Sequence, residues 1–205
     1  DIDALRNKVK QAEEVYLKAA KQLSQKRSKA ASQLSKEVTL AMQDLSMAGG
    51  QLEIALLPLP EGGSSGLEQI EFQVAGHAGS TPRSLAKVAS GGELARISLA
   101  ISVITSKASF TPTLIFDEVD AGIGGAVAET VGKLLRQLGE SHQIICVTHL
   151  PQVAAQGNHH LKVSKSQAGN TTLSQVSTLG RNERVEEIAR MLGGATITCL
   201  LYTSD

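Results

Sequence analysis

Three short stretches within residues 90–149 decide the fold of this chain. Ser-Gly-Gly-Glu at 90–93 opens a helical pattern, Leu-Ile-Phe at 114–116 leads into Asp-Glu, and Ile-Ile-Cys-Val at 144–147 leads into Thr-His. Buried strands that carry polar residues at their carboxyl ends form the edge where open α/β sheets bind ligands. A glycine pair at a helix start exposes backbone N–H groups along the helix dipole, which favours anions. Together the three stretches predict a nucleotide phosphate site.

Each feature also has a simpler interpretation when it stands alone. Residues 90–93 have the Ser-x-x-Glu spacing of a capping box, so they can be only a helix start. Asp117 and Glu118 can simply begin a loop, and His149 can be a structural residue. In the functional interpretation Asp117 holds Mg²⁺ through water, Glu118 orients the attacking water, and His149 reaches the γ-phosphate. The order of the three features along one predicted sheet edge favours the functional interpretation.

Length and composition set the outer limits of the prediction. The 205 residues suffice for one well-buried domain and an appendage, and the 20 basic and 20 acidic side chains cancel. The two cysteines have no metal-binding spacing, and Cys146 within an apolar strand is expected to be a buried, inert thiol. Neither a signal peptide nor an apolar run of membrane-spanning length is present. We therefore expect a cytoplasmic protein without a membrane partner.

Residues 5–45 are typical of one long helix. Its length and its narrow, alanine-rich apolar seam favour half of a coiled coil, although an amphipathic helix packed on the domain is the alternative. Nothing else in the sequence is expected to pair with this helix, so we expect the partner to lie outside it. The seam steps by four and three residues, with interruptions, through Leu5, Val9, Ala12, Tyr16, Ala19, Leu23, Ala30, Leu34, Val38, Ala41 and Leu45.

Basic residues outnumber acidic ones in the first 36 positions. This excess has two interpretations: a solvated helix face, or a surface that follows the phosphates of DNA. The basic residues are Arg6, Lys8, Lys10, Lys18, Lys21, Lys26, Arg27, Lys29 and Lys36.

After the glycine pair 49–50 the pattern changes to shorter elements. Pro58 and Pro60 are expected to close the first strand, and a Gly/Ser loop at 61–66 is expected to follow it. The strand at 113–116 is apolar on both faces, which predicts a central, parallel strand. We expect strands at 52–57 and about 70–74, a buried helix from 90, a strand–helix–strand unit over 113–147, a hairpin over 161–176 and a helix at 184–192.

The same stretches resemble the motifs of ABC-type ATPase heads. Residues 85–96 (LAKVASGGELAR) are similar to the signature motif, residues 113–120 (TLIFDEVD) to the Walker B strand, and residues 147–149 (VTH) to the switch histidine. In such heads two copies clamp ATP between them. The resemblance therefore implies ATP and Mg²⁺ as ligands and a second copy of the head as a partner.

A narrower likeness to the SMC-like DNA repair ATPases of bacteria covers about residues 5–195. This likeness rests on the amino-acid sequences of residues 117–125, 148–154 and 187–194. It implies an α/β fold, the C-terminal lobe of an ABC/SMC-type P-loop ATPase head with an N-terminal coiled-coil helix. The implied domains are a returning coiled-coil arm at 1–48, the head lobe at 49–195, and an atypical tail at 196–205 that does not resemble the family's C-terminal helix.

The resemblance also assigns roles by position. Asp117 supports Mg²⁺, through water, Glu118 is the general base, and His149 is the switch. The D-loop falls on the glycine-rich turn, with Gly124 at a position where many SMC relatives carry an acid. The residues implied to contact the nucleotide are Ser90, Gly91, Gly92 and Glu93 for the γ-phosphate of ATP held by the opposite head, together with Asp117, Gly122 and Gly124.

The sequence departs from the family in lacking a G-x-x-x-x-G-K-[ST] loop, so the main phosphate cradle (Walker A) and the Q-loop of the same lobe are absent. We therefore expect the chain alone not to hydrolyse ATP and to need an N-terminal lobe. The implied function is repair of DNA double-strand breaks and recombination at the bacterial nucleoid, with DNA as a partner.

Two alternatives remain. The first is the ATPase subunit of an ABC transporter, which the long helix at 5–45 and the wording Ala-Ser-Gly-Gly-Glu at 89–93 oppose, because transporters usually carry L-S-G-G-Q. The second is a half-head that binds without hydrolysing.

Overall fold

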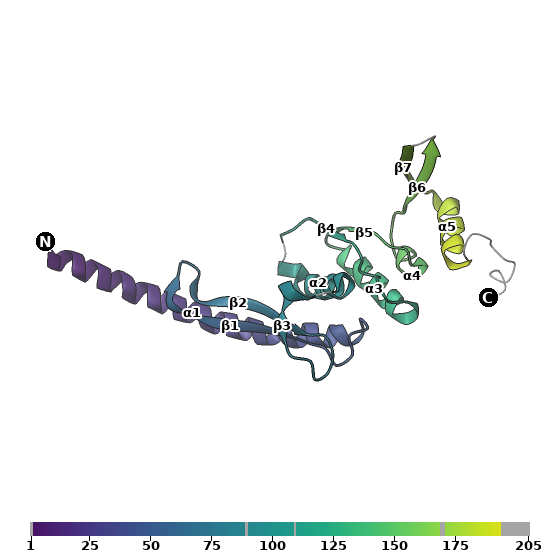
Figure 1. Cartoon of the computed structure of the whole chain (residues 1–205). Coiled ribbons are helices and arrows are strands. Elements are labelled where there is room, and N and C mark those ends of the chain that lie inside the picture. Colours follow the sequence, from purple (N-terminus) through teal and green to yellow (C-terminus); the bar gives the residue numbers. More distant parts are fainter. Residues whose placement is uncertain (1, 89, 109, 169–170, 194–205) are drawn as a thin grey trace. The chain divides into compact units, whose positions relative to one another are not determined.

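A computed structural model describes residues 2–88, 90–108, 110–168 and 171–193, and the predicted tail at 196–205 lies outside these residues (Figure 1). The chain forms two compact units, of which the first ends at Ser90 and the second begins at Gly91. In the described part of the chain, no helix has both the length and the apolar character needed to cross a membrane.

The first unit combines one long helix with a small antiparallel sheet. Helix α1 (Ile2–Gln43) has 42 residues. Strands β1 and β2 form a long hairpin, and the short strand β3 pairs with β2, which gives the sheet order β1-β2-β3. The bounds are β1 (Gln51–Gly63), β2 (Gly66–Ala75), β3 (Arg83–Ser84) and the 3₁₀ helix η1 (Leu85–Lys87).

The β1–β2 hairpin lies along α1 from about Tyr16 to its carboxyl end (Figure 1). The Tyr16 hydroxyl donates to the Gly63 carbonyl at 2.9 Å and accepts from its N–H at 3.0 Å, and the Thr39 hydroxyl accepts from the Leu52 N–H at 3.0 Å. The expectation that no other segment pairs with the helix is therefore wrong from Tyr16 onward, where the partner is a sheet. The buried helix residues are Ala20, Ala31, Val38 and Met42.

The part of α1 before Tyr16 remains uncovered within the described residues of its own unit, and residues 2–15 are all exposed. Leu5 and Val9, two members of the predicted seam, are 63% and 65% exposed. An apolar stripe of this kind is stabilised by burial, and the predicted coiled-coil pairing of this part of the helix remains a prediction. The predicted division at residue 48 remains a prediction.

Strand β1 does not end at its prolines, as the sequence suggested. It continues to Gly63, with an irregular register between Pro58 and Gly63, so only residues 64 and 65 separate it from β2. The reason is that β1 is an edge strand, with a neighbour on one side only. Proline is tolerated there because the missing N–H can face away from the ladder.

The second unit contains a strand–helix–strand motif followed by a hairpin and a helix. Strands β4 and β5 pair in parallel, as predicted, and β6 and β7 form the predicted antiparallel hairpin. Helix α3 contacts both α2 and α4. The bounds are α2 (Gly91–Thr105), η2 (Ser106–Ala108), β4 (Thr113–Phe116), α3 (Gly125–Leu138), β5 (Gln143–Cys146), α4 (Pro151–Ala154), β6 (Leu161–Ala168), β7 (Thr171–Thr178) and α5 (Arg181–Gly193).

The core of this unit lies between α2, α3 and the residues that follow β4. Ile97, Leu99, Val119 and Val131 are all fully buried. The predicted burial of the α2 helix is confirmed in part, since Leu94, Ile101, Val103 and Ile104 are only half-buried. The β4–β5 sheet itself departs from the prediction of a central strand with both faces covered. Within the described residues it has two strands, and the apolar residues Ile115, Ile145 and Val147, in or directly after these strands, are 69%, 43% and 58% exposed.

Helix α5 is tied to the rest of the second unit by charged side chains. The Arg184 guanidinium donates to the carbonyls of Ala154 and Ala155 at the end of α4. The buried Glu187 carboxylate accepts from Lys162 Nζ of β6 at 2.5 Å and from Arg190 Nη2 at 2.6 Å. These hydrogen bonds, the one from Arg190 above all, lower the pKa of Glu187 to about 2.

Candidate functional site

Strands β4 and β5 lie side by side (Figure 1), and three of the predicted functional residues, Asp117, Glu118 and His149, follow them in the chain. Phe116 is paired with Cys146, and the Val147 N–H donates to the Phe116 carbonyl at 2.9 Å. Because the two strands are parallel, the residues that follow both of them emerge at their common carboxyl end. The structure thus confirms that Asp117 and His149 leave one sheet edge.

The two carboxylates after β4 are both exposed. Asp117 Oδ1 accepts from the Glu118 N–H at 2.9 Å. Glu118 has φ +58°, in the left-handed region that non-glycine residues rarely adopt and that costs about 1–2 kcal/mol. Such strain at an exposed acid directs the side chain rather than stabilising the fold. An exposed Asp at a strand end fits Mg²⁺, which prefers carboxylate and water oxygens.

The start of α2 lies close to the loop after β4. The Glu118 carboxylate oxygen Oε2 occupies the space in which a side chain on Gly91 would lie. A Cβ on Gly92 would lie 3.0 Å from both the Cβ and the carbonyl oxygen of Ala121. The glycine pair that the sequence assigned to a phosphate therefore also permits close packing within the chain. Glu118, an anion, is the group that faces the start of the helix.

Arg96 locks this packing and was not identified from the sequence. Its side chain is buried, and Nη1 donates to the Ala121 carbonyl at 2.9 Å. Burial lowers the pKa of the Arg96 guanidinium, and the Glu93 charge partly opposes this effect. Sequence periodicity placed position 96 inside the helix but gave no sign that an arginine there would be buried.

The remaining predicted site residues are Ser90, Glu93, Gly122, Gly124 and His149. Ser90 ends the first unit, and its predicted capping box with Glu93 remains a prediction. Gly122 is exposed with φ +72°, whereas Gly124 has φ −167°, an extended conformation that any residue adopts. Within the described ranges, no hydrogen bond or ion pair joins His149 to Asp117 or to Glu118.

Asp120 is the second residue that sequence reasoning missed. It is 3% exposed, and its Oδ2 accepts from the Thr148 hydroxyl and from the His149 N–H, the latter at 3.0 Å. The same oxygen lies 3.2 Å from Nδ1 of the His149 ring, whose side chain is 71% exposed. The third acid of the Asp-Glu-Val-Asp stretch therefore points inward, while the first two are exposed.

Cys146 lies beside these acids on β5. Its burial, and then the charges of Asp120 and Asp117, raise the pKa of the half-buried Cys146 thiol to about 12. The thiolate is the reactive form of cysteine, so the raised pKa disfavours reaction near neutral pH, but the side chain is half-buried and not fully buried as predicted.

Comparison with known proteins gives sequence relatives described as DNA repair proteins. No protein-family model matches the chain. A protein from Xylella fastidiosa (strain 9a5c) described as "DNA repair protein RecN" is 48% identical over 199 residues, which are 96% of this chain and 36% of that protein. A protein of the same description from Vibrio cholerae is 44% identical over 198 residues, again 96% of this chain and 36% of that protein. The chain thus spans about a third of the length of these relatives.

Solved structures of SMC heads share the fold. A crystal structure of the Smc head domain with a coiled coil and joint from Pyrococcus yayanosii has a TM-score of 0.59 and 22% identity, and covers 91% of this chain and 35% of that one. A second structure, from work on ATP-driven dimerization and DNA-stimulated activation of SMC ATPases, has a TM-score of 0.50 and 23% identity, and covers 83% of this chain and 96% of that one. The likeness confirms the predicted α/β fold class of an SMC-type ATPase head lobe with a long N-terminal helix.

Proposed function

Because this chain belongs to the RecN family over the third of its relatives' length that it matches, we propose that it forms part of an ATP-hydrolysing, SMC-like DNA repair protein. The observation that carries the proposal is the shared sheet edge, from which Asp117, Glu118 and His149 all emerge. Repair of double-strand breaks by recombination at the bacterial nucleoid is the proposed setting.

The proposed chemistry follows from the kinds of side chain at this edge. Asp117 holds Mg²⁺ through water, and the bound ion supplies charge neutralisation at the phosphates. Glu118 accepts the proton of the attacking water. Its carboxylate is exposed, and its left-handed backbone conformation fixes the direction in which the side chain leaves the chain. His149 contacts the γ-phosphate and responds to its loss.

The glycine-containing stretch serves a different nucleotide in this proposal. Ser90, Gly91, Gly92 and Glu93 contact the γ-phosphate of an ATP molecule held by the opposite head, and the turn with Gly122 and Gly124 lies at the interface. The Glu118 side chain lies against Gly91 within one chain, so engagement with a partner's phosphate requires that side chain to turn away. Because the sequence contains no Walker A loop, an N-terminal lobe has to supply it, and the chain alone is proposed to be inactive.

DNA is the proposed polyanionic partner, and α1 offers a surface for it. Residues 15–36 contain six basic residues and no acidic residue, and Arg27 is engaged by Glu68 at 3.5 Å. The other five, Lys18, Lys21, Lys26, Lys29 and Lys36, are exposed and form no ion pair within the described chain. Unpaired lysines along one helix match the regular charge of a phosphate backbone.

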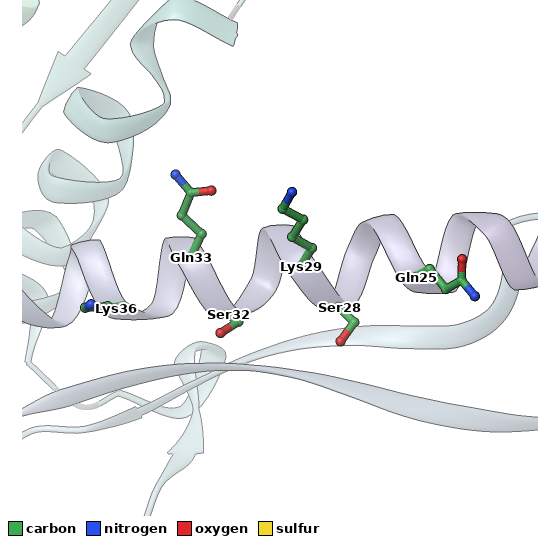
Figure 2. A pocket seen from close by; sticks show the side chains of 6 residues that line it. All are labelled: Gln25, Ser28, Lys29, Ser32, Gln33 and Lys36. Atoms are coloured by element: carbon green, nitrogen blue, oxygen red, sulfur yellow. The ribbon is translucent and has the colours of Figure 1, made fainter.

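The polar side chains between these lysines add hydrogen-bond donors. An open groove of about 670 Å³ runs along α1 and is lined by Gln25, Ser28, Lys29, Ser32, Gln33 and Lys36. Figure 2 shows these six side chains on successive turns of the helix, with Lys29 and Gln33 projecting outward. The described part of this face carries no aromatic side chain, and the proposed contact is with phosphates and not with bases.

The general-base assignment is tested in the complete protein that carries this chain. Glu118→Gln keeps the side-chain shape and removes the proton acceptor, so it should leave ATP binding intact, abolish turnover and trap closed head dimers. Glu129→Gln is the matched control, since Glu129 is an exposed acid of α3 that pairs with Lys133 of the same helix. Turnover by Glu118→Gln near the wild-type rate would contradict the assignment.

The role of the glycine-containing stretch is tested by Ser90→Arg. A bulky charged side chain at the helix start should block closure of two heads while sparing ATP binding to one head. Normal ATP-dependent dimerisation of this variant would refute the proposed contact with a partner's phosphate.

The DNA surface is tested by the combined substitution of Lys18, Lys29 and Lys36 by Gln. Each phosphate contact contributes about 0.9 to the slope of log K against log salt, so the slope should fall by about 2–3. The assay is fluorescence anisotropy with duplex DNA over a salt series, and Lys133→Gln is the control. An unchanged slope would show that these lysines do not contact DNA. It would leave the ATPase proposal unaffected.

A half-head that binds nucleotide without hydrolysing it is the second candidate, which the missing Walker A loop favours. It predicts no turnover in the complete protein, whereas the first proposal predicts turnover that depends on Glu118. A single steady-state ATPase measurement on wild type and Glu118→Gln separates the two.

A further inference from the structure

Asp120 has no part in the chemistry proposed above, yet its carboxylate joins the two loops at the sheet edge. One oxygen, Oδ2, accepts from the Thr148 hydroxyl and from the His149 N–H at 3.0 Å, and it lies 3.2 Å from Nδ1 of the His149 ring, within ion-pair distance. The side chain is 3% exposed. A carboxylate is costly to bury unless it is hydrogen-bonded, so these donors account for its presence inside the fold.

The third contact has a consequence that the first two lack. The Thr148 hydroxyl and the backbone N–H of His149 fix the path of the chain as it leaves β5. The ring contact instead restrains a side chain that is 71% exposed and would otherwise sample several rotamers. Asp120 thus connects the inside of the loop after β4 to the orientation of an exposed imidazole.

Thr148 shares in the same arrangement. Its hydroxyl donates to Asp120 and accepts from the Leu150 N–H at 3.1 Å, directly before Pro151 opens α4. The peptide units on both sides of His149 are therefore anchored, one by Asp120 and the other by Thr148. A ring on an anchored backbone, held at one nitrogen, keeps a single orientation.

We propose that Asp120 is a positioning residue that holds His149 by Nδ1, so that Nε2 is the ring atom presented to the nucleotide. Because a carboxylate is an acceptor only, Nδ1 has to carry the hydrogen, and the neutral ring is the Nδ1–H tautomer. Free histidine favours the other tautomer. The orientation of the ring stands on the contacts above, and only the group that Nε2 meets rests on the proposed function.

The tautomer provides a test that needs no ATP. The whole chain, labelled with ¹⁵N at histidine, is examined by long-range ¹H–¹⁵N spectra at about pH 8.5, about two units above the usual histidine pKa. The His149 signals are assigned from their loss in His149→Gln. We expect the Nδ1–H pattern in the wild type, its retention in Asp120→Asn, whose amide oxygen still accepts, and the Nε2–H pattern in Asp120→Ala.

The wild-type spectrum decides the question even if Asp120→Ala does not fold. An Nε2–H pattern in the wild type would overturn the proposal, and so would an Nδ1–H pattern that persists in a folded Asp120→Ala variant. Thr148→Val is the second variant, because it removes the neighbouring hydroxyl at nearly constant volume. It should leave the Nδ1–H pattern in place.

Kinetics of the complete protein test the consequence for catalysis. A hydrogen bond to a charged group is worth enough that its loss should lower kcat roughly tenfold to a hundredfold in Asp120→Ala, with KM for ATP changed less than about twofold. Asp120→Asn should recover part of the rate. Asp44→Ala, at an exposed turn after α1, is the control.

The two proposals fail in different ways. A wild-type protein without turnover contradicts the proposed ATPase and leaves the tautomer result intact. A wild-type rate in Asp120→Ala, beside a strong loss in Glu118→Gln, contradicts the positioning role alone.

Discussion

Replacing Glu187 by Gln should weaken the attachment of α5 to the β6–β7 hairpin in a pH-dependent way. The Glu187 side chain is 8% exposed and accepts from Lys162 and Arg190. Its pKa is about 2, against an ordinary 4.5, which corresponds to an upper limit of about 3 kcal/mol of stability. The two partners are 37% and 50% exposed, so solvent screening reduces the expected effect to about 1–2 kcal/mol.

The sign of this effect follows from the lowered pKa. Since the folded state holds the carboxylate ionised more strongly than the unfolded chain does, the contribution is fully present above about pH 4.5. It is lost as the pH falls from there towards 2. Glu187→Gln has no such titration, so the difference in stability between wild type and variant should shrink over the same interval.

Hydrogen exchange of the α5 amides, measured at about pH 7 and at about pH 3, is the assay that isolates this element. Glu186→Gln is the matched control. The Glu186 side chain, next to Glu187 in the sequence, is exposed and forms no ion pair within the described part of the chain. Equal protection factors in Glu186→Gln and Glu187→Gln at pH 7 would refute the reasoning, and so would a difference that does not change with pH.

Three further substitutions test the packing described above. Tyr16→Phe removes the hydroxyl that binds both backbone groups of Gly63, and amide exchange at the hairpin tip should accelerate roughly tenfold, as expected for about 1–1.5 kcal/mol. Gly92→Ala places a methyl 3.0 Å from Ala121 and should lower stability by about 1–3 kcal/mol in a urea titration. Arg184→Ala uncovers the carbonyls at the end of α4, and limited proteolysis should cut faster around residues 155–158, whereas cutting at the wild-type rate would contradict the capping role.

Local signals in the sequence were sufficient for the strand–helix–strand unit. The apolar runs at 113–116 and 144–147 and the helix between them carry patterns of the right period and length, so the parallel pair and its polar edge followed. The β6–β7 hairpin followed in the same way from a four-residue break between alternating stretches. These elements are determined by residues close together in the chain.

The misses arise from contacts between residues far apart in the sequence. The seam of α1 looks the same whether a helix or a sheet covers it, so the β1–β2 hairpin could not be recognised as its cover. Continuation of β1 past Pro58 depends on its being an edge strand, which is a property of the assembled sheet. Asp120 and Arg96 differ from exposed residues of the same type only by burial, and burial is decided by the tertiary fold.

The hairpin that lies along α1 makes the helix a mechanical element. Hydrogen bonds at Tyr16 and Thr39 clamp it near both ends of the hairpin, so bending is confined to the residues before Tyr16. At a rise of about 1.5 Å per residue, α1 is about 63 Å long. A rotation of about 10° at its carboxyl end therefore displaces Ile2 by about 11 Å. The hairpin thus stiffens the helix, so that a small rotation at one end becomes a large displacement at the other, as in a lever.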